Sequence, residues 1–320
     1  MNDKIEIKVL ILPKIEIGEM TGDAPGEAQF FYEEYFASDD TEKFRIRGTD
    51  GKCPLYVNDG IAMILTGTGK VSVANTLTAV LLDPRFDFTQ AYILCTGCAG
   101  SVTEKTVIGD VVIETACVDF DLGHHADPRD MKTANPDRTW FREAIYDDMG
   151  CIILDQELCD KVYRLAENVK LSTTARTKAA LAATFDDAEW TQRDPKVSKG
   201  TSVAGDNYWK GRYDEANAIY MAKAYECPDP YMVTEMEDVA AARVARNFGM
   251  LDHFISMRVS VDMDVFLKGE SPETIWGHLE DLSTTEELDE RDEMLDMFPV
   301  AMKNAFIAGK AVIDGIRAGL

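Results

Sequence analysis

The stretch IAMILTGTGKVSVANTLTAVLL, residues 61–82, decides the fold that the sequence predicts. Its first five residues form an apolar run with the length and composition of a buried strand. The glycine-rich turn 66–69 follows, and residues 71–82 then predict a helix that ends before Asp83-Pro84. A strand that leads through a glycine turn into a helix is the usual ligand-binding corner of α/β proteins, because the helix N-terminus presents unpaired N–H groups.

The same alternation continues on both sides of this corner. Apolar runs predict strands at residues 5–12, 92–95, 107–112, 151–154, 201–204 and 254–261, and a hairpin around Asn58-Asp59-Gly60. Helices are expected at residues 28–36, 155–169, 215–225, 238–248 and 292–320, with Gly249 as a C′ glycine, Pro299 at a start or kink, and a second glycine turn at 97–100. Since no linker or repeat is visible, we expect a single α/β domain over residues 1–320, with a central mixed, twisted sheet flanked by helices.

Composition limits the classes of partner. The 320 residues carry a net charge of −24, so nucleic acid and anionic membrane surfaces are not expected as partners, whereas a neutral small molecule is. No apolar run approaches the ~20 residues that span a bilayer. No signal peptide is visible, so we expect a cytoplasmic protein, or a periplasmic or extracellular one if a leader has been removed. Seven cysteines, including Cys95 and Cys98 in one C-x-x-C, are expected to be reduced thiols.

Several short motifs occur in a distinctive order: TGTG (66–69), CTGCAG (95–100), VIGDVV (107–112), TEME (234–237) and RVSVD (258–262). In this order they resemble the nucleoside phosphorylase and nucleosidase superfamily. VLILPK (9–14), EIGEM (16–20), GEAQ (26–29) and DFDLGHHADPR (119–129) extend the resemblance over nearly the whole chain, to the purine nucleoside permease family. The resemblance implies a nucleoside phosphorylase-like fold, a purine nucleoside (adenosine, inosine or guanosine) as ligand, no cofactor or metal, and a homo-oligomer.

The TEME motif is expected to bind ribose. The resemblance places Met236 against the sugar and assigns Glu237 to its hydroxyl groups; a carboxylate accepts two such donors in charge-assisted bonds. These bonds would strengthen as the sugar gains oxocarbenium character. The alternative is a carboxylate that merely complements a helix N-terminus. Thr96, Gly97 and Cys98 lie at a strand end and are expected to form part of the binding turn.

The base is expected to meet an acid and an aromatic ring. By resemblance Asp262, four residues after Arg258, protonates purine N7, which makes the base a better leaving group. Asp264 is the alternative acid, because Val261 separates Ser260 from Asp262 where the superfamily has Ser directly before Asp. Tyr208 is expected to stack on the base and Asn207 to read its edge.

The N-terminal loop favours water over phosphate as the nucleophile. Residues 18–27 carry acids and no arginine, and Leu94 or Cys95 stands where bacterial purine phosphorylases carry an arginine. A hydrolase needs a carboxylate near ribose C1′, and either Glu16 or Glu19 is expected to orient the water. Spacing alone does not choose between them.

These inferences together predict a purine nucleosidase, an N-ribosyl hydrolase. Two alternatives stay open. The family name implies a nucleoside-binding component of nucleoside transport with little turnover. A phosphate-dependent purine nucleoside phosphorylase is the other, with positive charge from Lys70, Arg45 or Arg47.

The polar loop 119–148 has two interpretations. One of its adjacent histidines, His124, is expected to contact the 5′-hydroxyl of the nucleoside while the other holds the loop. A metal site is the alternative, with possible ligands Asp119, Asp121, His124, His125 and Asp127. A loop that closes over substrate is favoured, because no reaction of the superfamily needs a metal.

Overall fold

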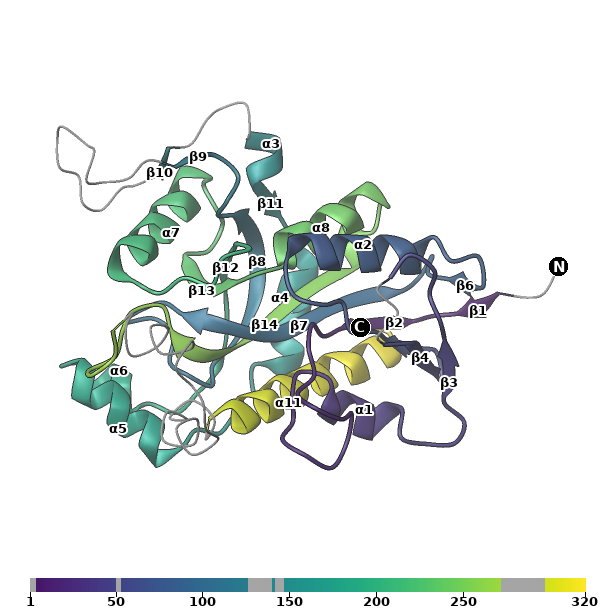
Figure 1. Ribbon diagram of the computed structural model, residues 1–320, viewed down its shortest axis with the longest axis horizontal. Helices are drawn as coiled ribbons and strands as arrows, with labels where there is room; N and C mark the ends of the chain where they lie inside the picture. The colour runs from purple at the N-terminus through teal and green to yellow at the C-terminus, as the bar shows by residue number, and fades with distance from the viewer. Residues whose placement is uncertain (1–3, 50–52, 126–139, 142–146, 272–296) are drawn as a thin grey trace, which may run out of the picture.

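The computed structural model describes residues 4–49, 53–125, 140–141, 147–271 and 297–320, and its centre is a ten-stranded mixed sheet (Figure 1). Along the sheet the strands run in the order β11 (Cys151–Ile153), β8 (Val111–Asp119), β12 (Val197–Ala204), β13 (Tyr231–Glu235), β7 (Tyr92–Ser101), β2 (Val9–Leu12), β5 (Ile61–Met63), β4 (Leu55–Asn58) and β3 (Glu42–Phe44). The tenth strand, β14 (Phe254–Met263), pairs with both β7 and β8.

Pairing of β14 with two strands closes a ring in the sheet. β7 is parallel to β14, β14 is antiparallel to β8, β8 and β12 are parallel, β12 and β13 are parallel, and β13 returns antiparallel to β7. Every residue of β8 and β14 is buried. Polar side chains on these two strands therefore lie inside the protein and need partners there.

Helices cover the sheet on both sides (Figure 1). On one side α2 (Lys70–Leu81) packs against α8 (Asp238–Asn247), and on the other α11 (Phe298–Arg317) packs against α1 (Gln29–Tyr35) and α4 (Gln156–Ala166). The remaining elements are α5 (Ala175–Thr184), α6 (Ala188–Gln192), α7 (Arg212–Ala224), α3 (Asp147–Gly150), the 3-10 turn η3 (Leu251–His253), and the short pairs β1 (Ile5–Glu6) with β6 (Phe86–Asp87) and β9 (His124–His125) with β10 (Trp140–Phe141).

The predicted α/β fold with a mixed sheet flanked by helices is confirmed. The hairpin between β4 and β5 turns through Asp59 and Gly60, whose φ values of 47° and 73° are those of a two-residue type I′ turn. Gly249 follows α8 with a φ of 70°, as a C′ glycine does. Pro299 lies in the first turn of α11 and starts that helix.

Several local predictions were wrong. Residues 97–100 are not a turn: they continue β7, where Gly97 pairs with Arg258 and Gly100 with Asp262 on β14. Residues 107–110 form a turn closed by Asp110 before β8 begins. The strand predicted at 5–12 is divided into β1 and β2. The sequence patterns also failed to identify β13, α5 and α6.

Two further expectations concern the whole chain. Within the described ranges, no helix combines the length and the hydropathy needed to cross a membrane. All seven cysteines are free in the structure, and each is buried or half-buried. Their reduced state stays a prediction. The single domain over residues 1–320 stays a prediction.

Candidate functional site

A cavity of about 250 Å³ lies where β7, β13 and β14 meet the N-terminal loop and the segment before α7. Six of the residues singled out from the sequence line it: Cys98, Asn207, Tyr208, Met236, Glu237 and Asp262. Its other charged lining residues are Lys14, Glu27, Glu235 and Arg258. These six predicted residues, which are separated by up to 164 positions in the chain, thus face one space.

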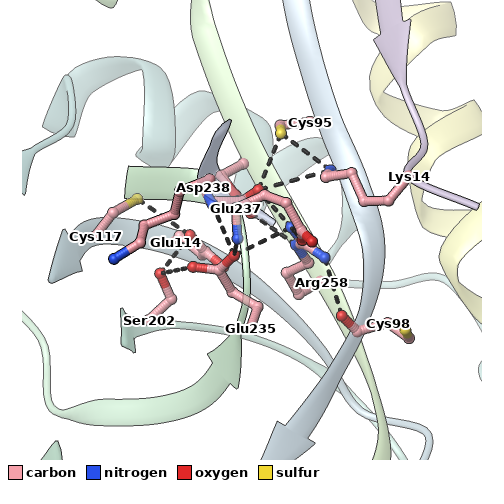
Figure 2. Close-up of polar contacts among 12 residues, drawn as sticks. Lys14, Cys95, Cys98, Glu114, Cys117, Ser202, Glu235, Glu237, Asp238 and Arg258 are labelled. Atoms are coloured by element: carbon pink, nitrogen blue, oxygen red, sulfur yellow. Dashed lines mark hydrogen bonds and ion pairs between the residues drawn. The ribbon is translucent and has the colours of Figure 1, made fainter. Parts of the chain in front are cut away.

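Arg258 on β14 organises the floor of the cavity (Figure 2). Its guanidinium, 1% exposed, binds Asp238 bidentately, with Nε 2.7 Å from Oδ2 and Nη2 2.5 Å from Oδ1. Nη2 also lies 2.9 Å from Glu237 Oε2 and 3.2 Å from Glu235 Oε2, while Nη1 donates to the Cys98 carbonyl at 3.0 Å. Burial opposes the charge of this guanidinium, but the carboxylates, Asp238 foremost, raise its pKa well above the usual value.

Two neighbouring carboxylates at the start of α8, those of Glu235 and Glu237, have different partners. Glu235 Oε2 accepts from the N–H groups of Glu237 and Asp238, at 2.5 and 2.7 Å, and so satisfies the helix N-terminus. The Glu237 side chain makes no such capping bond. Its Oε1 accepts instead from the Gly69 N–H at 2.8 Å, and its Oε2 from Arg258. Glu237 is therefore held at the cavity wall and is not a helix cap.

The glycine turn before α2 is fixed by acids of the 119–129 motif. Lys70 Nζ lies 2.6 Å from Asp119 Oδ1 and 2.8 Å from Asp121 Oδ2. The Lys70 N–H donates to Asp206 at 2.7 Å, and the Asp206 N–H donates to Asp121 at 2.6 Å. These contacts hold the turn that gives Gly69 its place against Glu237. They also engage two of the proposed metal ligands and the lysine that a phosphorylase would have used.

Lys14 is a second buried cation at the cavity. Its ammonium, on a residue 3% exposed, donates to the Leu12 and Thr96 carbonyls at 2.9 and 3.0 Å and to Cys95 Sγ at 3.2 Å. It also lies 3.6 Å from Asp238 Oδ1. An ammonium has three N–H donors, and each has an acceptor within the protein.

More carboxyl groups than cations meet beneath the cavity. Four of them, Glu114, Glu235, Glu237 and Asp238, surround Arg258 and Lys14 (Figure 2). Burial would raise the pKa of Asp238, but Arg258 and Lys14 hold it below its usual range. Burial, with the Asp238 charge, raises the pKa of Glu114 to about 8, and the pKa of Glu235 is raised well above its usual value for the same reasons. The cluster therefore retains protons at neutral pH.

The same acids form a group whose oxygens approach closely enough for a metal ion. Within the described part of the chain this group is Glu114, Glu235 and Asp238. The Arg258 guanidinium already binds Glu235 and Asp238, so a cation occupies the place that a metal would take.

At the opposite wall, Asp262 sits at the end of β14 and is 4% exposed. Its Oδ2 accepts a hydrogen bond from the Tyr208 hydroxyl and lies 3.8 Å from Lys210 Nζ. Burial raises the pKa of Asp262, while Lys210 and Tyr208 act against that rise. Tyr208 is 48% exposed, so part of its ring faces the solvent side of the cavity. A buried carboxyl that tends to keep its proton is suited to act as an acid.

Asp264, the alternative acid, lies behind Asp262 and does not line the cavity. Its Oδ2 accepts from the Tyr231 hydroxyl, and burial raises its pKa well above the usual value. A side chain at Gly100 would run into the Asp264 carboxylate, so glycine there makes room for the two acids.

Glu27 is a cavity carboxylate that sequence reasoning missed. It lies just before α1 and is 5% exposed. Its Oε2 accepts from the Lys14 N–H at 2.6 Å and its Oε1 from the Cys98 N–H at 2.8 Å. A Cβ on Gly97 would approach Glu27 Oε1 to 2.6 Å, which explains the glycine. The GEAQ motif at the start of a predicted helix was the signal that could have identified it.

The structure does not bring the other predicted site residues to the cavity. Glu16 folds back on its own loop, where its carboxylate accepts from the N–H groups of Ile17 and Ala28 at 3.0 Å and from that of Gly26. Glu19 is exposed on the same loop. Neither position fits the prediction that one of them orients water, because neither side chain lines the cavity.

Two further predicted residues, Thr96 and His124, do not line the cavity. Thr96 is buried, and its carbonyl accepts a hydrogen bond from the Lys14 ammonium. His124 is exposed on β9 and does not line the cavity, so its predicted contact with a 5′-hydroxyl has no support in its position. Asp127, one of the alternative metal ligands, lies outside the described residues, as does the side chain of His125.

The fold is that of the nucleoside phosphorylases and nucleosidases. The 5′-methylthioadenosine/S-adenosylhomocysteine nucleosidase of Helicobacter pylori superposes with a TM-score of 0.58 at 15% identity, over 98% of this chain and 100% of that one. The corresponding Neisseria meningitidis nucleosidase gives 0.57 at 16%, over 96% and 99%. The futalosine hydrolase of Helicobacter pylori gives 0.57 at 15%, over 97% and 98%. At these identities the likeness establishes the fold alone.

The chain belongs to the purine nucleoside permease (NUP) family, whose sequence model matches residues 6–319. It is 29% identical over 180 residues to the purine nucleoside permease of Candida albicans, which covers 50% of this chain and 44% of that one. It is 25% identical over 169 residues to a probable purine nucleoside permease of Schizosaccharomyces pombe, covering 48% of each. The chain thus spans about half the length of the curated relatives it matches. The family resemblance stated from the motifs is confirmed.

Surplus carboxyls beneath the cavity make stability depend on pH. Between the unfolded value of Glu114, near 4.5, and its folded value of about 8, the folded protein holds a proton that the unfolded chain has lost. Stability should therefore fall as pH rises through this window, by at most about 1.4 kcal/mol per pH unit for one proton. Glu114→Gln should make the free energy of unfolding depend less steeply on pH, as measured by urea unfolding at steps of about one unit between about pH 5 and 9.

Glu42→Gln, at an exposed position on edge strand β3, is the matched control and should leave the wild-type slope unchanged. An equally steep fall in Glu114→Gln would show that Glu114 is ionised in the folded protein and that the surplus proton lies elsewhere.

Proposed function

We propose that this chain is a purine nucleoside N-ribosyl hydrolase that binds its substrate in the Arg258 cavity. The family is named for purine nucleosides, and a nucleosidase of the same fold from Colwellia psychrerythraea was solved with adenine bound. In the reaction, water would add to ribose C1′ as the bond from C1′ to the purine nitrogen breaks, giving free base and ribose.

Ribose would lie against Met236 and Glu237. Both Glu237 oxygens have one donor from the protein, Gly69 and Arg258, which leaves lone pairs for the sugar hydroxyls. Because Arg258 holds this carboxylate in place beforehand, little reorganisation is needed as positive charge develops on the sugar. Binding that strengthens in the transition state accelerates bond cleavage.

The base would lie at the Asp262 end. Asp262 would give its proton to N7 of the purine, so that the base leaves neutral and the bonding electrons pass to it. In the free protein the Tyr208 hydroxyl occupies one Asp262 oxygen. Tyr208 would therefore exchange this bond for contact with the purine ring when substrate enters.

Glu27 would act as the base for water. Its carboxylate is oriented by the N–H groups of Lys14 and Cys98, and Glu27 lines the cavity. Taking a proton from water as oxygen attacks C1′ would balance the proton that Asp262 gives to the purine. This assignment replaces Glu16 and Glu19 in the role expected from the sequence.

One observation supports water over phosphate as the nucleophile: both cations at the cavity already have partners within the protein. Among the lining residues that the structure describes, the cations are Lys14 and Arg258. The three donors of Lys14 have acceptors in the protein, and Arg258 is bound by three carboxylates and a carbonyl. An incoming phosphate would meet the surrounding carboxylates without a free partner for its charge. A carboxylate such as Glu27 repels phosphate and suits water.

The family name supports a second candidate function. A protein of nucleoside uptake would use the same cavity to bind a purine nucleoside and would release it intact. The two functions share the ribose and base contacts and differ in whether Glu27 and Asp262 act on the bound molecule.

Release of free base separates these possibilities. The protein is incubated with inosine or adenosine, and the free bases are measured by chromatography. Hypoxanthine or adenine should form at the same rate with and without inorganic phosphate. Asp262→Asn should lose this activity, which excludes a contaminating nucleosidase. Release that requires phosphate would contradict hydrolysis, and tight nucleoside binding without release would favour the uptake function.

The position of Glu27 gives a sharper test of the chemistry. Glu27→Gln keeps the size and one of the two hydrogen-bond acceptors but cannot take a proton from water, so kcat for base release should fall by about 10²–10⁴-fold while KM changes little.

Glu19→Gln is the matched control, on the same loop but exposed, and should retain the wild-type rate. If instead Glu19→Gln or Glu16→Gln abolished turnover and Glu27→Gln did not, the water-activating role would return to the loop.

A further inference from the structure

A buried lysine connects the candidate acid to the protein surface. Lys210 lies just before α7, and its side chain is 1% exposed. Its ammonium is 3.8 Å from Asp262 Oδ2 and 3.2 Å from Glu270 Oε2. Glu270 is 26% exposed and also accepts from the Leu267 N–H at 2.7 Å. One ammonium is thus shared between a cavity carboxyl and a carboxylate that reaches solvent.

Burying the Lys210 ammonium costs free energy, and packing alone does not explain why a charged side chain is present there. A buried ammonium loses several kcal/mol of hydration, and it recovers that loss only through close, well-oriented partners. A neutral side chain of similar length would fill the same space without the penalty. Lys210 does not itself line the cavity, so its charge acts on the cavity only through Asp262.

Among the residues that the structure describes, the other charged and titratable groups around Asp262 come from several elements. They are Tyr208 and Lys210 from the segment before α7, Asp264 on the same strand, Glu270, and, beyond Asp264, Tyr231 on β13 and Glu215 on α7. Tyr231 binds Asp264, and Glu215 accepts from the Thr103 N–H, so both are engaged away from Asp262. Lys210 is the cation of this group.

We propose that Lys210 is a positioning residue whose ammonium stabilises the carboxylate that Asp262 becomes on giving its proton to the purine, and that Glu270 limits this stabilisation by sharing the ammonium. The inference rests on the proposed hydrolase function. The Asp262 proton passes to N7, and the C1′–N bond breaks with its electrons moving to the base.

The two partners of Lys210 have opposite effects on Asp262. Burial raises the pKa of Asp262, Lys210 acts to lower it, and Glu270 acts to raise it. Without Lys210 the Asp262 carboxyl would hold its proton more firmly, and without Glu270 it would give that proton up more readily. The sharing therefore sets how readily Asp262 acts as an acid.

Titration of Asp262 in the free protein tests this directly. Protein labelled with ¹³C at the aspartate carboxyl carbons is titrated by NMR, and Asp262→Asn assigns the resonance. Lys210→Met should move the Asp262 midpoint to higher pH, and Glu270→Gln should move it to lower pH. Glu42→Gln, a remote exposed carboxylate, should not move it. The pH profile of kcat for base release should shift in the same two directions.

Opposite shifts support the proposal; shifts of the same sign, or none, overturn it. Should Lys210→Met fail to fold, Glu270→Gln at its part-exposed position carries the test, and an unchanged Asp262 midpoint there overturns the proposal. Because the NMR titration needs no turnover, its result is separate from the proposed function, which fails only if wild-type protein releases no base.

Discussion

The bidentate ion pair between Arg258 and Asp238 is the constraint on which the site depends. A guanidinium that is 1% exposed must find partners for its charge within the fold, since leaving one buried without them costs several kcal/mol. Its position requires β14, β13 and the start of α8 to meet in one register. In that register the Glu235 carboxylate accepts the N–H groups at the start of α8, and the Glu237 carboxylate binds Arg258 at the cavity wall. The ring formed by β14 with β7 and β8 keeps this arrangement away from solvent.

Charge balance around that pair links the fold to a chemical preference. The carboxyls outnumber the cations, so Lys14 and Arg258 are both paired with groups of the protein, and the pKa values of Glu114 and Glu235 are raised. In the proposed function, a site of this kind holds a neutral sugar through its hydroxyls and disfavours a phosphate dianion. The nucleosidase fold and the permease family name are compatible on this view, because each needs a cavity that recognises a purine nucleoside. They differ only in what happens after binding.

The sequence predicted those parts of the site that lie within continuous motifs. Glu237 and Asp262 stand in the TEME and RVSVD motifs, and both line the cavity. Glu27 was missed because its contact with Cys98 on β7 joins residues 71 positions apart, which the sequence pattern does not show. Lys14 and Lys210 were missed because their roles depend on partners that are distant in the chain, such as Cys95, Asp238 and Glu270.

The fold shows the same division between local and long-range information. Alternating strands and helices predicted the mixed α/β sheet, and turn chemistry located the hairpin and the C′ glycine. The glycines at 97 and 100 suggested a turn by composition, yet they lie within β7. They are small because Glu27 and the Asp262–Asp264 pair need the space, a requirement that only the assembled sheet reveals.

The most direct test of the central claim is a crystal structure with a purine nucleoside analogue whose glycosidic C–N bond is replaced by an uncleavable C–C bond. The account predicts ribose hydroxyls within hydrogen-bond distance of Glu237, the N7 position at Asp262, and Glu27 facing C1′ on the side opposite the base. An analogue bound outside the cavity, or bound in it with the sugar away from Glu237, would contradict the account.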